Sequence, residues 1–120
     1  MIVMKQSNNK IKELKRKRNN IFKEMFIYRS CIRGSITKIY KMCSNRECEC
    51  HSTNRKKHGL ASYISSSHDG RTRMIYVPFP MEEEAEKRVE GYKRLRELIE
   101  ELSEINSEIF KLEKVLKKGE

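Results

Sequence analysis

The stretch at residues 95–116, LRELIEELSEINSEIFKLEKVL, largely decides the fold. Its leucines and isoleucines alternate spacings of three and four residues, which is the heptad pattern of a coiled-coil seam. The seam consists of Leu95, Leu98, Leu102, Ile105, Ile109, Leu112 and Leu116. Acidic residues at 82–84 complement the dipole of a helix that starts there, and no proline follows Pro80. We therefore predict one helix from about Met81 to Lys118, roughly 55 Å long.

A seam of this length requires a partner helix. Apolar residues at near-helical spacing predict a second helix from about Ser7 or Asn8, as N-cap, to Arg29. This helix is about half as long as the first, and its apolar residues concentrate in its C-terminal half. We therefore expect a homodimer through residues 85–116 with the N-terminal helix also packed in. The sequence leaves parallel and antiparallel pairing open.

The middle of the chain has the composition of a small sheet. β-branched and aromatic residues predict strands at 35–42, 61–65 and 72–77. Asp69-Gly70 between the last two is typical of a type I′ hairpin turn, which needs positive φ at both central residues. The predicted fold class is α+β: an N-terminal helix, a three-stranded antiparallel sheet and a long C-terminal coiled-coil helix. Three short strands are barely stable unaided, so we expect a stapling element.

Three cysteines within eight residues supply that element. Cys43, Cys48 and Cys50 form a C-x4-C-x-C pattern. The sequence shows no membrane span and no secretory signal, which predicts a cytoplasmic protein whose thiols stay reduced and available to a metal. Three thiolates and one histidine make a tetrahedral zinc site. His58 is the preferred fourth ligand because it can reach back from the next strand, whereas His51 adjoins Cys50.

The sequence leaves alternative ligands and an alternative metal centre open. His51 is the second choice of fourth ligand, and His68 and Cys31 are remoter ones. An iron–sulfur cluster would recruit Cys31 as a fourth thiolate. Glu47 and Glu49 are more simply interpreted as solvated charges of a loop than as groups that assist a catalytic zinc ion. The sequence carries no phosphate-binding loop, nucleophile elbow or acidic pair for two-metal chemistry. We expect structural zinc and no enzymatic activity.

The core of the chain resembles a family of small, uncharacterised prokaryotic proteins, frequent in archaea and mobile elements. The resemblance covers about residues 30–110 and rests on Gly34-Ser35-Ile36, Tyr40 to Cys43, Cys48-Glu49-Cys50, His58-Gly59, Gly70 to Arg73, Tyr76-Val77-Pro78, Tyr92 to Leu95 and Glu104-Ile105-Asn106. Ser44 replaces the usual glycine after the first cysteine, and Leu60-Ala61 replaces Pro-Tyr. The resemblance implies His58 as the fourth ligand and implies no activity.

The positive charge is unevenly distributed. The formal net charge is +10, and residues 1–80 carry 18 Lys and Arg against 5 Asp and Glu. Such an excess predicts an anionic partner, with nucleic acid first and a membrane surface second. Of the nucleic acids, we expect DNA ahead of RNA. The expected phosphate contacts are Lys15, Arg16, Lys17, Arg18, Arg55, Lys56, Lys57, Arg71 and Arg73. Strand tyrosines at 40, 63 and 76 suit core positions or cross-strand pairs better than base stacking.

These observations predict a dimeric, zinc-stabilised, weakly sequence-specific nucleic-acid-binding protein. The alternative is an accessory subunit that docks a larger protein of a mobile-element or defence complex through the long helix. Along the chain we expect a basic helix at 1–30, a zinc-binding β module at 31–79 and the long helix at 80–120, joined as one continuous unit.

Overall fold

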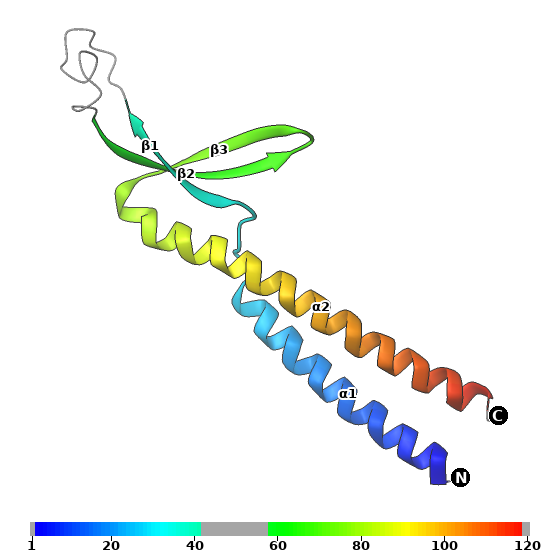
Figure 1. Ribbon diagram of the computed structural model, residues 1–120. Coiled ribbons are helices and arrows are strands. Elements are labelled where there is room, and N and C mark those ends of the chain that lie inside the picture. The colour runs from blue at the N-terminus through cyan, green and yellow to red at the C-terminus, as the bar shows by residue number, and fades with distance from the viewer. Residues whose placement is uncertain (1, 42–57, 119–120) are drawn as a thin grey trace. The chain divides into compact units, whose positions relative to one another are not determined.

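The computed structural model describes residues 2–41 and 58–118 (Figure 1). The elements are α1 (Ile2–Ile27), β1 (Ser35–Lys41), β2 (His58–His68), β3 (Arg71–Val77), a short 3-10 helix η2 (Phe79–Met81) and α2 (Glu82–Lys118). This order confirms the α+β class with two helices around a three-stranded antiparallel sheet. The chain divides into two compact units, Met1–Ser30 with Gly91–Glu120, and Cys31–Glu90.

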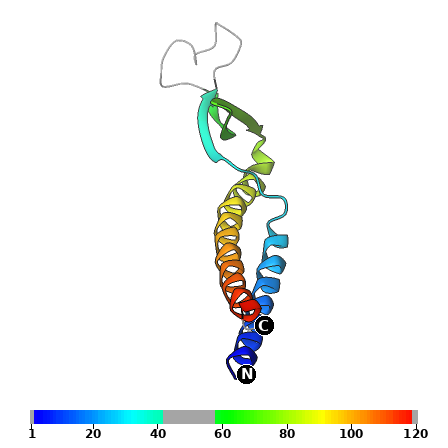
Figure 2. The ribbon, with the colours of Figure 1, turned by 90° about the vertical axis from the view of Figure 1, so that its right-hand side faces the viewer.

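The first unit is an antiparallel helix pair, visible in Figures 1 and 2. Near one end Arg94 contacts Glu24, and further along Arg18 contacts Asn106. At the other end the seam packs around a core, whose members are Ile11, Leu14, Ile105, Ile109, Leu112 and Leu116. Leu98 is completely buried between these regions. The predicted heptad seam is therefore an intramolecular interface with α1.

α1 begins earlier than predicted, at Ile2, and ends at Ile27. The cap candidates, Ser7, Asn8 and Asn9, all lie inside the helix. Ser7 is buried on the same face as Ile11 and Leu14, at spacings of four and seven residues. With 26 residues α1 is about 39 Å long, which matches the part of α2 in this unit. The expectation that α1 covers only half of the seam fails because the helix is longer.

The second unit contains the sheet, in the order β1-β2-β3. β2 extends over 11 residues, beyond the predicted 61–65 at both ends. Asp69 and Gly70 have φ of 50° and 76°, and His68 pairs with Arg71 across them. Positive φ at both positions confirms the predicted I′-type hairpin.

One face of the sheet packs on the start of α2. Ile64, Val77, Ala85 and Val89 form its buried core. The buried Ser62 donates from Oγ to Oε1 of Glu82 at 2.8 Å, which satisfies a hydroxyl that would be costly to bury alone. The sheet therefore has an apolar cover of its own, in addition to any metal. No helix in the described ranges is long and apolar enough to cross a membrane.

Candidate nucleic-acid interface

The predicted metal ligands fall mostly outside the described residues. Cys43, Cys48 and Cys50 lie in 42–57, as does the alternative ligand His51, and His58 is the first residue of β2. Lys41, the last residue of β1, is the register partner of His58. Opposite residues in antiparallel strands have Cα atoms roughly 4.5–5.5 Å apart. The cysteine-bearing segment therefore starts and ends at adjoining positions on one end of the sheet, with His58 at its exit.

The remoter ligand candidates belong to the other end of the sheet. His68 closes β2, ten residues after His58, and at about 3.3 Å per residue this separates the two by roughly 33 Å. Cys31 is half-buried and precedes the start of β1, where Ser35 pairs with Ser65. Within 2–41 and 58–118, no three His, Cys, Asp or Glu side chains are grouped as metal ligands. The described backbone therefore places His58, and not His68 or Cys31, at the end of the sheet where the cysteine-bearing segment begins and ends.

The four consecutive cations predicted on α1 spread around the helix, since successive residues turn by 100°. Lys15, Arg16 and Lys17 are exposed. The Lys17 Nζ lies 3.9 Å from Oε1 of Glu13. Arg18 is half-buried, and its Nη1 donates to Oδ1 of Asn106 at 3.1 Å. These residues do not form one phosphate-binding face.

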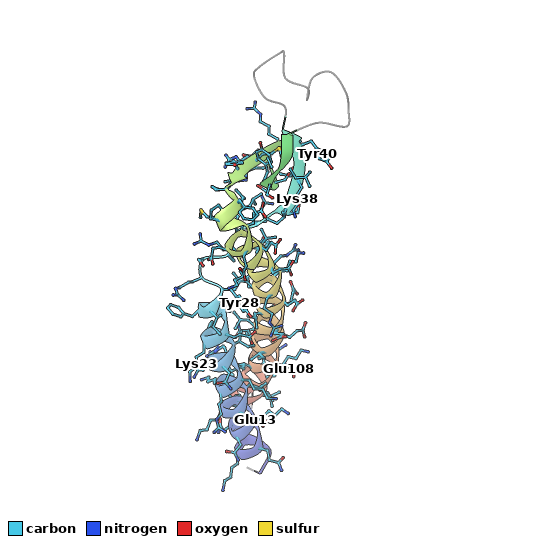
Figure 3. The ribbon with its side chains drawn as sticks, turned by 90° about the vertical axis from the view of Figure 1, so that its left-hand side faces the viewer. Glu13, Lys23, Tyr28, Lys38, Tyr40 and Glu108 are labelled. Carbon is cyan, nitrogen blue, oxygen red and sulfur yellow. The ribbon has the colours of Figure 1, made fainter. Side chains whose placement is uncertain are left out.

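A different set of cations does form one face of α1. Lys5, Lys12, Arg16 and Lys23 are all exposed and are spaced by 7, 4 and 7 residues. On an α-helix these spacings place them within about 40° of one another, along a line of about 27 Å. We call these four residues the basic stripe. Figure 3 shows Lys23 on the side of α1 that faces away from α2.

The acidic residues of α1 lie off the basic stripe. α1 contains Glu13 and Glu24. Glu24 accepts two hydrogen bonds from Arg94, at 2.7 Å from Nε and 3.1 Å from Nη2. The hydrogen bond from Arg94 lowers the pKa of Glu24, and the same bond, with a further one to Glu97, raises the pKa of Arg94. Both partners are charged at neutral pH, and each cancels much of the other's field.

Sequence reasoning missed Lys5, Lys12 and Lys23 because it sought runs of cations. The signal that finds them is periodicity. Residues at i, i+7, i+11 and i+18 share one helix face, so cations at those positions line up once the helix start is known.

A second group of cations gathers at the β2–β3 hairpin. Arg71 and Arg73, both predicted, are exposed on β3. Arg33 is held at the same hairpin from the β1 side, because its Nη2 donates to the carbonyl oxygen of Ser67 at 2.5 Å. We call Arg33, Arg71 and Arg73 the hairpin cluster. The remaining predicted contacts, Arg55, Lys56 and Lys57, lie outside the described residues.

Two of the strand tyrosines, Tyr63 and Tyr76, lie on the opposite face of the sheet from Arg71 and Arg73. Tyr63 and Tyr76 are register partners and contact edge to face, with ring centroids 5.7 Å apart. Tyr76 is three residues from Arg73, and an odd separation on a strand means opposite faces. The preferred interpretation of these two tyrosines as a cross-strand pair is confirmed. Tyr40, on the other edge strand, is exposed (Figure 3).

The comparisons with known proteins add no neighbour. No protein-family model matches the sequence, no curated protein matches it, and no solved structure matches it. The resemblance to the small prokaryotic family stays a prediction.

Proposed function

We propose that this protein binds nucleic acid, DNA ahead of RNA, without enzymatic activity, through the basic stripe of α1. The observation that carries the proposal is four exposed cations in line on the face opposite the buried Ile11 and Leu14. Lysine and arginine side chains so placed can neutralise backbone phosphates without reading bases, so binding is expected to be salt-dependent and weakly sequence-specific.

The hairpin cluster is a second candidate phosphate-binding surface. Its arginines present guanidinium groups, whose paired N–H donors match phosphate oxygens. Asp69 is the single acid within the β2–β3 hairpin at residues 58–77. Arg55, Lys56 and Lys57 add positive charge to the sequence between the cysteines and β2.

A structural zinc ion is part of this proposal. Cys43, Cys48 and Cys50 with His58 fit zinc chemically, because three thiolates and an imidazole complete a tetrahedral shell that leaves no open position. The pairing of Lys41 with His58 supports this ligand set, since it holds the two ends of the cysteine segment together. The ion would fix this end of the sheet. Reduced thiols suit a cytoplasmic protein, which we also propose.

The test measures binding of the full chain to a fluorescent DNA duplex by anisotropy at several salt concentrations. The variant Lys12→Gln with Arg16→Gln removes two cations from the basic stripe. We expect weaker binding and a salt slope smaller by about 2, because each phosphate contact on duplex DNA contributes about 0.9 to that slope.

The matched control is Lys10→Gln with Lys17→Gln, which removes the same charge from the same helix. Lys10 and Lys17 project from a flank of α1, about 100° or more from the basic stripe. A wild-type protein that does not bind at low salt contradicts the proposal. Equal losses in the two double variants would mean that net charge, rather than the stripe, governs binding.

The alternative function is docking of a larger protein through the long helix. The favouring observation is that α2 exposes large apolar side chains, Ile99, Phe110 and Val115, on the part that packs with α1. Absence of DNA binding together with a folded protein would favour this alternative.

A further inference from the structure

α2 carries a second heptad series beside the seam that packs on α1. Its positions follow spacings of 4, 3, 4, 3, 4, 3 and 4 residues over about 38 Å. They are Tyr92, Arg96, Ile99, Ser103, Asn106, Phe110, Glu113 and Lys117. All are exposed except Tyr92, which is half-buried. We call these eight residues the outer stripe.

The outer stripe borders two shallow grooves that are open to solvent. One open groove of about 600 Å³ is lined by Ile99, Ser103, Asn106 and Phe110 among others. A second, of about 390 Å³, continues from Phe110 past Glu113 to Lys117. Ile99 and Phe110 lie three turns apart on one face of α2, and they are 47% and 64% exposed.

The chemistry of the outer stripe is palindromic. About a point between residues 104 and 105, apolar Ile99 mirrors apolar Phe110, and polar Ser103 mirrors polar Asn106. Further out, cationic Arg96 mirrors anionic Glu113. This symmetry is what an antiparallel pair of identical helices requires, because each layer then joins a position to its mirror position.

We propose that a second copy of this chain docks antiparallel on the outer stripe. Each of four layers is complementary and occurs twice in the pair. Ile99 packs on Phe110 of the other copy, and the Asn106 amide donates to the Ser103 hydroxyl. Arg96 forms an ion pair with Glu113, and the Lys117 ammonium lies against the Tyr92 ring.

The charges argue for the antiparallel orientation. In a parallel pair each position meets itself, so Arg96, Glu113 and Lys117 would each face a like charge, which is unfavourable. In the antiparallel pair Arg96 and Glu113 attract instead. Within the part of the chain that the structure describes, neither forms an intramolecular ion pair, so both are available to another copy.

This inference stands apart from nucleic-acid binding, because the outer stripe and the basic stripe share no residue. It revises the expected dimer, whose seam is occupied by α1 of the same chain. A pair formed through the outer stripes would carry two basic stripes.

The first test is the mass of the full chain in solution by sedimentation equilibrium over a range of concentrations. We expect a monomer–dimer equilibrium in the wild type. Phe110→Glu is expected to weaken the dimer by about 100-fold or more, as for a central aromatic anchor. The control Val115→Glu adds the same charge at a side chain that is also exposed but lies off the outer stripe. Circular dichroism verifies that both variants keep their helices.

The second test is a charge exchange. Arg96→Glu and Glu113→Arg are each expected to weaken the dimer roughly tenfold, since each creates like-charge layers. The double variant restores opposite charges and is expected to recover dimerisation to within about threefold. The two residues are about 25 Å apart along one helix, so rescue cannot occur within a single copy.

Three results would overturn the inference. The first is a wild type that is monomeric at every concentration, which would leave the outer stripe to a different partner. The second is a dimer that Phe110→Glu does not weaken. The third is a double charge variant that is as weak as the single variants, since that excludes the antiparallel register.

Discussion

At the scale of single residues, Gly34 is a backbone position that has no room for a side chain. Its φ is +153°, and a Cβ built there would lie 2.7 Å from the carbonyl oxygen of Ser65 on the neighbouring strand. Gly34→Ala therefore combines an unfavourable φ with a backbone clash, and we expect a loss of about 1–3 kcal/mol in the free energy of unfolding. Urea unfolding followed by circular dichroism measures it.

The control for this prediction is Gly59→Ala. Gly59 has no atom within 4 Å of an added Cβ and no positive φ, so the same substitution there is expected to be almost neutral. Equal losses at the two glycines would show that the close approach of Gly34 to Ser65 is not what matters.

The Glu24–Arg94 pair predicts a defined pH dependence. Arg94 lowers the pKa of Glu24 from its ordinary value of 4.5, so the charged carboxylate is favoured in the folded state. For a lowered pKa, the stabilisation is fully present above the unfolded value and is lost as pH falls through the folded value. The urea midpoint of the wild type should therefore exceed that of Glu24→Gln at pH 7, and the difference should shrink below about pH 4.5.

Glu13→Gln is the control for that prediction. It removes a 3.9 Å contact between two exposed side chains, and such contacts contribute little to stability. Its midpoint should follow the wild type at both pH values. A Glu24→Gln deficit that is unchanged at pH 3 would assign the loss to packing rather than charge.

At the scale of elements, the helix pair depends on Leu98. This side chain has no exposed surface, so truncation leaves a cavity among tightly packed neighbours. We expect Leu98→Ala to cost about 2–5 kcal/mol in the free energy of unfolding. Val115→Ala removes apolar surface from a half-exposed position on the same helix and should cost far less. Thermal unfolding of the two variants provides the comparison.

Some elements of the fold can be predicted from local sequence signals, and others cannot. The long helix and the Asp69-Gly70 turn follow from local signals, a heptad period and two residues that tolerate positive φ, and both are confirmed. The start of α1 does not follow from a local signal. Ser7 has the chemistry of an N-cap residue, yet tertiary packing buries it inside the helix. The predicted start was too late in the chain, so α1 was expected to be too short to cover the seam. A second chain was therefore predicted as the partner of the seam.

The candidate site illustrates the same limit. Cysteine spacing alone predicts a metal, but it says nothing of the register that sets His58 opposite Lys41. Lys15 to Arg18 were predicted as phosphate contacts because four cations follow one another in the sequence. The basic stripe, by contrast, depends on which face of α1 is buried. That face is a property of packing against α2.

At the scale of the whole molecule, the two compact units have separate cores. Ile64, Val77, Ala85 and Val89 serve the sheet unit, and the residues around Ile11, Leu14 and Ile109 serve the helix pair. Among the residues that the structure describes, none belongs to both cores, although α2 contributes to each. Loss of structure in one unit can therefore leave the other folded, which makes the effect of the proposed zinc ion local and measurable.

Removal of the metal is therefore expected to loosen the sheet unit selectively. Native-state hydrogen exchange, with and without a chelator, should show lost protection in β1 and β2 beside Lys41 and His58. α1 and residues 91–118 should keep their protection, because their core lies in the other unit.

Cys43→Ser should reproduce the loss of protection without a chelator and abolish zinc binding, whereas Cys31→Ser should retain one zinc ion per chain. Equal loss of protection in both units would contradict separate cores, and a chain that purifies and refolds without zinc would remove the metal from the proposal.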